Sequence, residues 1–148
     1  MNNTPPFSAG EVFEGPSRTL TDAHFLLFSA VCGDVQPIHY DIEYAKATRF
    51  GKPVAHGLLL ASLTALGAST GRERCHGFVF VEQGCRFLRP AFVGDTILPR
   101  LTVERAWQEG RRRFCRFRTE LINQRHEPVL EGFHLYRIFD IEPLEDKP

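Results

Sequence analysis

The sequence lacks an excess of charge of either sign. Lysine and arginine together number 18, as do aspartate and glutamate, so the formal net charge is zero. A neutral chain has no long-range field that would concentrate nucleic acid or an anionic membrane at its surface. We therefore expect neither nucleic acid nor a membrane among the partners of this protein.

Cysteine is scarce and is not arranged for metal binding. The four cysteines, Cys32, Cys75, Cys85 and Cys115, include no C-x-x-C pair, and no Cys/His group has the spacing of metal ligands. The opening stretch MNNTPPFSAGE has no basic segment followed by an apolar one, as a secretory signal would have. Free thiols without an export signal are typical of a reducing compartment. We predict a cytoplasmic protein without a bound metal.

No internal repeat, low-complexity run or Ser/Gly linker divides the chain. A length of 148 residues and a hydrophobic content of 43% suit one globular domain with its own core. We expect residues 1–148 to form this single domain, with two short polar or proline-bearing tails, 1–8 and 142–148, that fray.

Apolar runs long enough to cross a membrane are also missing. The uncharged segment 57–70 has 14 residues. As a helix it would span about 21 Å, whereas the hydrocarbon core of a bilayer is about 30 Å thick. A helix that is apolar on every side must be enclosed. We therefore expect the protein itself to wrap this helix.

Two further helices are predicted before this segment. Thr21 is a suitable N-cap for a helix that stops at Gly33. Asp41 is a suitable N-cap for a second helix that ends at Gly51.

From residue 77 onward the pattern changes to strands. Apolar and charged residues alternate at 115–121 and, less cleanly, at 97–104, where Pro99 indicates an edge or a bulge. GFVFVE, GCRFLRP and VLEGFHLYRIF are three more strand candidates, and turns are predicted at 93–95, 109–110 and 123–124. Helices followed by antiparallel strands predict an α+β protein with a curved sheet around a central apolar helix.

One segment carries a recognisable chemical motif. GDVQPIHYDIEYAKATRFGKPVAHGLLLAS resembles the hydratase motif of the MaoC-like dehydratases, the (R)-specific enoyl-CoA hydratases. The segment FLRPAFVGDTI, residues 87–97, resembles the second half of that family, so the resemblance extends from about residue 11 to about residue 139. The matching motif positions are Asp34, Pro37, His39, Asp41, Tyr44, Ala45, Phe50, Pro53, His56 and Gly57.

The resemblance implies a hot-dog fold, in which an antiparallel sheet wraps around a central helix, and a homodimer or higher homo-oligomer that joins sheets edge to edge. It also implies an enzyme, a hydro-lyase that converts a trans-2-enoyl-CoA reversibly to an (R)-3-hydroxyacyl-CoA. Coenzyme A enters as part of the acyl-CoA substrate, and no other cofactor is implied.

The resemblance assigns roles to three positions. Asp34 and His39 would be the catalytic pair, and the backbone N–H of Gly57 would contribute to an oxyanion hole. A histidine can exchange a proton at neutral pH, and a carboxylate beside it can orient the same water. A helix N-terminus offers unpaired N–H groups to the negative charge that develops on the thioester oxygen.

Several neighbouring residues have a structural interpretation beside a functional one. His56 could belong to the substrate site, but a structural hydrogen bond at the helix entrance is favoured. Gln36 stands where the family commonly has asparagine, and Ala65 stands where some members have serine, so both bear on substrate choice. Ser62 and Thr64 suit hydrogen bonds back to helix carbonyls. The arginines of 111–118 suit a solvated strand face better than the phosphates of coenzyme A.

Three alternatives stay open. A mesaconyl-type hydratase would keep the fold and act on a branched or dicarboxylic acyl-CoA, which Gln36 would permit. A thioesterase would share the fold but agrees less well with the Asp34/His39 arrangement. A non-catalytic acyl-CoA-binding partner subunit would keep the pocket without turnover, which the presence of both residues disfavours.

Overall fold

The computed structural model describes residues 7–74 and 77–139. In these residues the sheet has six strands in the order β1-β4-β5-β6-β3, with β2 also beside β4, and every pair is antiparallel. The long strands are β3 (Phe78–Phe87), β4 (Thr96–Glu109), β5 (Arg112–Asn123) and β6 (Pro128–Ile138). The short ones are β1 (Val12–Glu14) and β2 (Arg18–Thr19).

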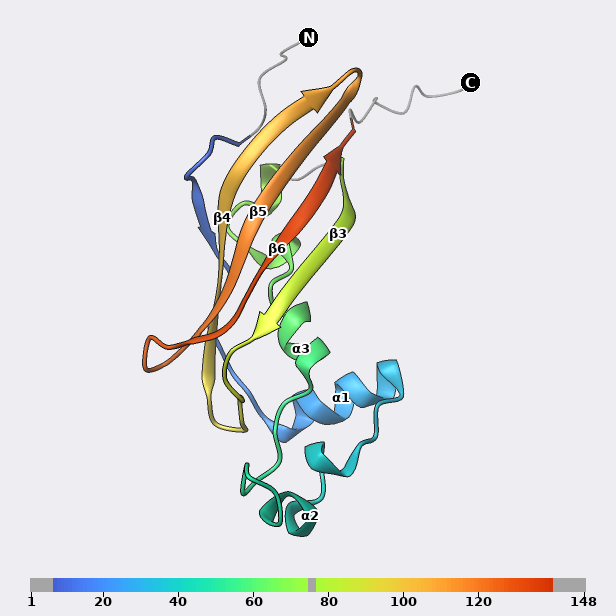
Figure 1. Cartoon of the computed structure of the whole chain (residues 1–148), viewed down its shortest axis with the longest axis vertical. Coiled ribbons are helices and arrows are strands. Elements are labelled where there is room, and N and C mark those ends of the chain that lie inside the picture. The colour runs from blue at the N-terminus through green and yellow to red at the C-terminus, as the bar shows by residue number, and fades with distance from the viewer. Residues whose placement is uncertain (1–6, 75–76, 140–148) are drawn as a thin grey trace.

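The helices are short and precede the long strands. They are α1 (Asp22–Cys32), α2 (Ile42–Lys46) and α3 (Gly57–Ser62), with 3₁₀ turns at Pro37–His39, Leu66–Ala68 and Arg72–Arg74. Figure 1 shows the long strands side by side as one curved sheet, with α3 next to it and α1 and α2 beyond one end. The predicted α+β fold with an antiparallel sheet is confirmed.

One face of the sheet is buried and supplies the core. Along β5, Cys115, Phe117 and Leu121 are fully buried, whereas Arg116 and Arg118 lie on the opposite face. The predicted alternation is therefore confirmed. The buried face contributes to two apolar clusters. The first contains Leu20, Phe25, Leu59, Leu60, Ile97, Leu121 and Leu130, and the second contains Phe7, Phe13, Leu66, Leu101, Val103, Cys115, Phe117, Tyr136 and Ile138.

The arginines of 111–118 confirm the interpretation as a solvated strand face. Arg116 forms an ion pair with Glu104 at 2.7 Å, and Arg118 lies 3.4 Å from Glu120. The guanidinium of Arg116 also lies 3.7 Å from the ring centre of Phe133. These partners hold both arginines on the outer face of the sheet.

The predicted turns are present, but two strand predictions need correction. Residues 93–95 lie between β3 and β4, and the other two turns begin where expected, with Glu109 ending β4 before Gly110 and Asn123 ending β5 before Gln124. GFVFVE and the first part of GCRFLRP form one strand, β3, because the residues at their junction, Gln83 and Gly84, also pair with β6. A bulge lies between Phe80 and Glu82. Pro99 marks neither an edge nor a bulge. It lies in β4 at the gap between β1 and β2, where its carbonyl oxygen accepts a hydrogen bond from the Gly15 N–H.

The helix predicted at 57–70 is much shorter than expected. It ends at Ser62, and a separate 3₁₀ turn follows at Leu66–Ala68. The hydroxyl of Ser62 donates to the carbonyl of Leu59, and that of Thr64 donates to Ala61, each at 2.7 Å. These hydroxyls compete for the carbonyls that further helical turns would use.

The first two helices begin as predicted. Thr21 is the N-cap of α1, and Gly33 ends the helix in the left-handed conformation that glycine tolerates. Asp41 caps α2 by accepting the N–H of Tyr44 at 2.9 Å. This helix ends at Lys46 rather than near Gly51, because the hydroxyl of Thr48 takes the Ala45 carbonyl.

The predicted N-terminal tail of residues 1–8 is too long. Phe7 is only 2% exposed and packs edge-on against Phe13, Phe78 and Phe117. Residues 1–6 and the predicted tail 142–148 lie outside the described residues. Cys32, Cys85 and Cys115 are free thiols, and Cys75 is not among the residues described. Within 7–74 and 77–139, none of the helices has the length and apolar character needed to cross a bilayer.

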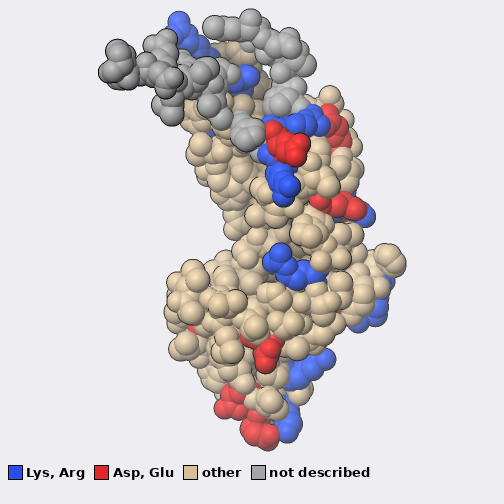
Figure 2. Space-filling view, turned by 180° about the vertical axis from the view of Figure 1, so that it is seen from behind, with Lys and Arg blue, Asp and Glu red and all other residues tan. Residues whose placement is uncertain are grey.

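Full enclosure of α3 by its own chain is contradicted. Leu59 and Leu60 are buried, but Leu58 is 65% exposed. The sheet covers one side of the helix, so the other side stays open. The neighbouring edge strand β3 also exposes Val79, Phe80 and Val81, each by about half. Figure 2 shows few charged residues around the middle of the molecule when it is viewed from behind.

A buried histidine joins the sheet to the segment after α3. His134 on β6 is 4% exposed, and its Nε2 lies 3.0 Å from the hydroxyl oxygen of Thr64. Because that hydroxyl donates to the Ala61 carbonyl, His134 must be the donor to Thr64. Its Nδ1 can then accept a hydrogen bond from the hydroxyl of Tyr136, 3.3 Å away. Burial lowers the pKa of His134 to about 4, so this ring is neutral at physiological pH.

We predict that self-association uses the open edge of β3. Replacing Val81 with glutamate places a charge on an exposed apolar edge and should convert a dimer to monomers at micromolar concentration. Val31→Glu is the matched control, because Val31 is 87% exposed on α1. Light scattering measures the mass of both variants. A wild-type protein that is a stable monomer would contradict the prediction.

We also predict that His134 makes the fold sensitive to acid. The unfolded chain takes up this proton near pH 6.5, whereas the folded protein resists it until about pH 4. The contribution of His134 to the free energy of unfolding is therefore full above pH 6.5 and declines as the pH falls. The loss reaches about 3 kcal/mol once the pH is below both pKa values. His134→Gln should flatten the dependence of Tm on pH in this interval. His126→Asn, on an exposed turn, should keep the wild-type slope.

Candidate active site

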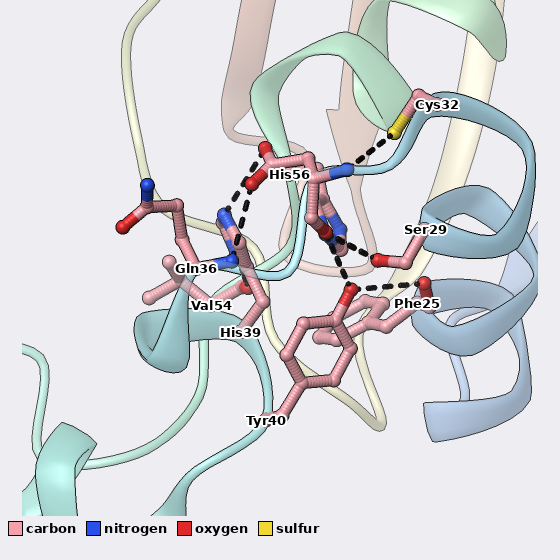
Figure 3. Close-up of polar contacts among 9 residues, drawn as sticks. Phe25, Ser29, Cys32, Gln36, His39, Tyr40, Val54 and His56 are labelled. Carbon is pink, nitrogen blue, oxygen red and sulfur yellow. Dashed lines mark hydrogen bonds and ion pairs between the residues drawn. The ribbon is translucent and has the colours of Figure 1, made fainter.

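The imidazole of His39 is held by a backbone carbonyl. Its Nδ1 lies 2.7 Å from the carbonyl oxygen of Val54, which lies just before α3 (Figure 3). A carbonyl can only accept, so Nδ1 carries the proton of the neutral ring. Nε2 is then left with a lone pair. The hydrogen bond thus selects the tautomer that presents a base at Nε2.

The carboxylate of Asp34 faces this base. Its Oδ2 lies 3.9 Å from Nε2 of His39, and the side chains of His39 and Asp34 are 11% and 41% exposed. The separation is too long for a direct hydrogen bond. A water about 2.8 Å from each atom would bridge it. The two residues that the sequence motif paired are therefore brought together, at a separation that one water would bridge.

The loop that carries Asp34 is anchored through its carbonyl oxygen. The hydroxyl of Ser29 on α1 donates to this oxygen at 2.6 Å, and that of Tyr40 lies 3.0 Å away. Oδ1 of the Asp34 carboxylate accepts the backbone N–H of Gln36 at 3.2 Å. These contacts fix the start of the loop while Oδ2 stays available to the water site.

His56 lies directly behind His39. The two rings are stacked, with centroids 3.7 Å apart and planes inclined by 23°. Nε2 of His56 lies 2.8 Å from the hydroxyl oxygen of Tyr40, and the whole residue is 1% exposed (Figure 3). Burial is the main cause that lowers the pKa of His56, and the nearby His39 lowers it further. His56 is therefore a neutral interior residue, as the favoured structural interpretation proposed.

The same three residues invite comparison with a metal centre. Asp34, His39 and His56 offer ligand atoms within 4.8 Å of one another. A metal ion lies near the plane of each imidazole that binds it, along the lone pair of the nitrogen. Each lone pair lies in the plane of its own ring, and two planes stacked 3.7 Å apart and inclined by only 23° do not bring both lone pairs to one nearby point. In addition, Nδ1 of His39 is occupied by Val54. The arrangement fits a held water better than a metal.

Two pockets flank this group. One, of about 240 Å³, is lined by the Gly57 wall of α3 and by Val54, Phe87 and two exposed arginines, Arg49 and Arg89. No hydrogen bond among the described residues uses the N–H of Gly57. A Cβ at Gly57 would lie 3.0 Å from the ring of Phe87, so any larger residue would crowd this ring.

His39 itself lines the second pocket, of about 420 Å³. Its apolar walls come from α1 and from the segments around α2 and Pro53, and the charged residues at this pocket are Asp22 and Lys52. The ammonium of Lys52 lies 4.5 Å from the ring centre of Phe92.

The predicted site residues do not all face the imidazoles. Gln36 contacts Asp34 only through its backbone, and its exposed side chain points away from the imidazoles (Figure 3). Ser29, Tyr40 and Val54 were not predicted as site residues. Tyr40 follows His39 immediately, which is a signal that was available. Val54 contributes its backbone carbonyl, which any residue would provide. Ser29 lies on α1, before the motif begins, so the motif identifies neither residue.

Several known proteins are similar to this chain in sequence or in fold. The family model described as "MaoC like domain" matches residues 6–124. An (R)-specific enoyl-CoA hydratase from Rhodospirillum rubrum is 31% identical over 113 residues, which cover 74% of this chain and 76% of the relative.

Two solved structures are similar over nearly their whole length. One is described as a monoamine oxidase regulatory protein from Archaeoglobus fulgius, with 32% identity, a TM-score of 0.82 and coverage of 92% of this chain and 93% of the other. The second is an (R)-hydratase from A. caviae involved in PHA biosynthesis. It has 25% identity, a TM-score of 0.77 and coverage of 90% and 98%.

We predict distinct states for the two stacked histidines. When its ring is neutral, His39 should carry the proton on Nδ1, because the carbonyl of Val54 accepts a hydrogen bond from this nitrogen. His56 should titrate below the ordinary histidine value because it is buried. Nitrogen-15 NMR of histidine-labelled protein measures both, with His39→Gln and His56→Gln used to assign the signals. A His39 ring protonated mainly on Nε2 in its neutral form would contradict the structure.

Proposed function

Because this chain belongs to the MaoC-like domain family, we propose that it adds water reversibly to a trans-2-enoyl-CoA, giving an (R)-3-hydroxyacyl-CoA. The observation that carries the proposal is the 3.9 Å separation between Oδ2 of Asp34 and the unprotonated Nε2 of His39. It offers a site where one water can be oriented and deprotonated.

Each catalytic step has a group suited to it. Nε2 of His39 accepts a proton from the water as its oxygen bonds to C3, and the resulting imidazolium returns a proton to C2. The carboxylate of Asp34 orients the water and favours the charged imidazolium while it exists. The reaction thus adds H and OH across the double bond with one residue serving as both base and acid. No metal or redox cofactor takes part in this proposal.

The thioester is proposed to lie in the pocket beside Gly57. As C3 is attacked, negative charge develops on the thioester oxygen, and the unused N–H of Gly57 is a donor for it. The wall formed by Phe87 is apolar and suits the pantetheine arm, while Arg49 and Arg89 offer positive charge to phosphate groups. In the described part of the chain, Arg89 donates to the Pro128 carbonyl at 2.8 Å, and the guanidinium of Arg49 lies 4.9 Å from the ring centre of Phe50.

Two alternative functions are a hydratase of branched or dicarboxylic substrates and a non-catalytic binding subunit. A branched or dicarboxylic enoyl-CoA, of the mesaconyl type, would need a positive or polar group near the acyl chain, and Lys52 beside His39 in the 420 Å³ pocket is a candidate. A non-catalytic acyl-CoA-binding partner subunit would bind the thioester without hydrating it. A panel of linear enoyl-CoAs and one dicarboxylic enoyl-CoA distinguishes these functions.

The catalytic pair gives the most direct prediction. Asp34→Asn and His39→Gln should each lower turnover of crotonyl-CoA by roughly 10²–10⁴ with the fold intact. The double variant should be little slower than the worse single one, since both act on the same water. Loss of the enoyl-thioester absorbance measures the rate, and a chiral column measures the handedness of the product. Glu73→Gln and His126→Asn are matched controls on the exposed surface.

Folded single variants that keep near wild-type rates would show that the pair is structural. A wild-type protein that binds enoyl-CoA and hydrates none of the panel would favour the partner subunit.

The arginines predict how the carrier is recognised. Arg49→Gln and Arg89→Gln should each raise the KM for crotonyl-CoA by about 3- to 10-fold, with kcat little changed, because an exposed charge contributes modestly. Crotonyl-pantetheine, which lacks the phosphates, should show no such rise. Arg118→Gln, on the outer face of the sheet, is the control. Equal effects on both substrates would place the phosphates elsewhere.

A further inference from the structure

His56 contacts both members of the catalytic pair without reaching the substrate. Its Nε2 lies 3.3 Å from the carbonyl oxygen of Asp34, and its ring face stacks on His39 at 3.7 Å. At 1% exposure it has no surface for a ligand. We propose that His56 is a positioning residue that sets the spacing between Asp34 and His39, an inference that rests on the proposed function.

The protons around the Asp34 carbonyl determine which tautomer of His56 is present. Ser29 donates its single hydroxyl hydrogen to this carbonyl at 2.6 Å, and the hydroxyl of Tyr40 can donate to the same oxygen at 3.0 Å. Nε2 of His56, 2.8 Å from the Tyr40 oxygen, then donates to it. The opposite tautomer would leave a buried N–H at Nδ1, which has no partner among the described residues. Buried N–H groups without a partner are rarer in proteins than buried acceptors without one, which favours the proton on Nε2.

With this tautomer, His56 completes a closed arrangement. Its N–H reaches Tyr40, the Tyr40 hydroxyl reaches the Asp34 backbone, and its ring supports the ring of His39 (Figure 3). Phe25 and Phe28 pack around the ring of His56, with centroids at 5.9 and 5.1 Å. The surrounding core therefore fixes the position of His56. His56 in turn restrains His39 by stacking and Asp34 through Tyr40.

The two contacts of His56 do different things. The stack restrains the plane of the His39 ring, while the Val54 carbonyl restrains its rotation within that plane. The polar contact restrains the backbone from which Asp34 projects. Loss of either contact lets the 3.9 Å separation change. A misplacement on the order of 1 Å at reacting groups can cost about 100-fold in rate.

Two substitutions separate these contacts. His56→Phe keeps an aromatic face and loses the nitrogen, and His56→Gln keeps an N–H donor and loses the ring. We expect each to lower kcat for crotonyl-CoA by about 10- to 100-fold while KM stays near the wild-type value. His134→Gln is the matched control, since it removes another buried histidine outside the site and should lower Tm without lowering the kcat of the folded enzyme.

A double-variant cycle tests how His56 acts. If His56 works by placing Asp34 against His39, adding His56→Phe or His56→Gln to Asp34→Asn should produce no further loss of kcat. A folded His56→Phe and His56→Gln with kcat within about twofold of wild type would overturn the inference. So would a loss that multiplies fully with that of Asp34→Asn, because it would mean that His56 acts independently of the pair.

A second readout does not depend on activity. Nitrogen-15 NMR should show one dominant tautomer of His39 in the wild-type protein and a mixture in His56→Gln, where the ring support is lost. An unchanged His39 signal in this variant would overturn the inference. Should the wild-type protein hydrate none of the enoyl-CoA panel, the proposed function fails, whereas the NMR result still supports or overturns the positioning role.

Discussion

The hydrogen bond from Nδ1 of His39 to the Val54 carbonyl decides what the site can do. It places the imidazole proton on the nitrogen that faces the protein and leaves the lone pair on the nitrogen that faces Asp34. Val54 precedes α3 by three residues, so the same short segment that holds the base also leads to the unused N–H of Gly57. One carbonyl thereby relates the base to the expected position of the thioester oxygen.

Much of this arrangement could be predicted from the sequence because it is local. Asp34 and His39 belong to one loop, and a proline between them limits the shapes the loop can take. Helix starts at Thr21 and Asp41 follow from capping chemistry, which depends on a few neighbouring residues. The alternation along β5 likewise reports burial directly, since one face of an antiparallel strand meets the core.

What the sequence did not predict depends on partners that are distant along the chain. Thr64, just after the shortened helix α3, contacts His134 of β6, a residue 70 positions away. The sequence predicts two strands where the structure has β3, because Gln83 and Gly84 are held in the strand by pairing with His134 and Phe133 of β6. The hydrogen bonds of Ser29 and Tyr40 to the Asp34 carbonyl, with His56 bonded in turn to Tyr40, have no sequence pattern, because a carbonyl oxygen is present at every residue.

The strand order has a consequence for how the molecule folds. β4, β5 and β6 follow one another in sequence and in space, joined by short turns, so their pairing closes only small loops. β3 precedes all three in the chain yet pairs with the last, Phe87 opposite Leu130. We expect the three-strand meander to form early and β3 to dock afterwards, since non-local pairing is the slower event. The step that completes the sheet is then the step that creates its open apolar edge. Folding intermediates in which β3 has not yet docked do not present this edge.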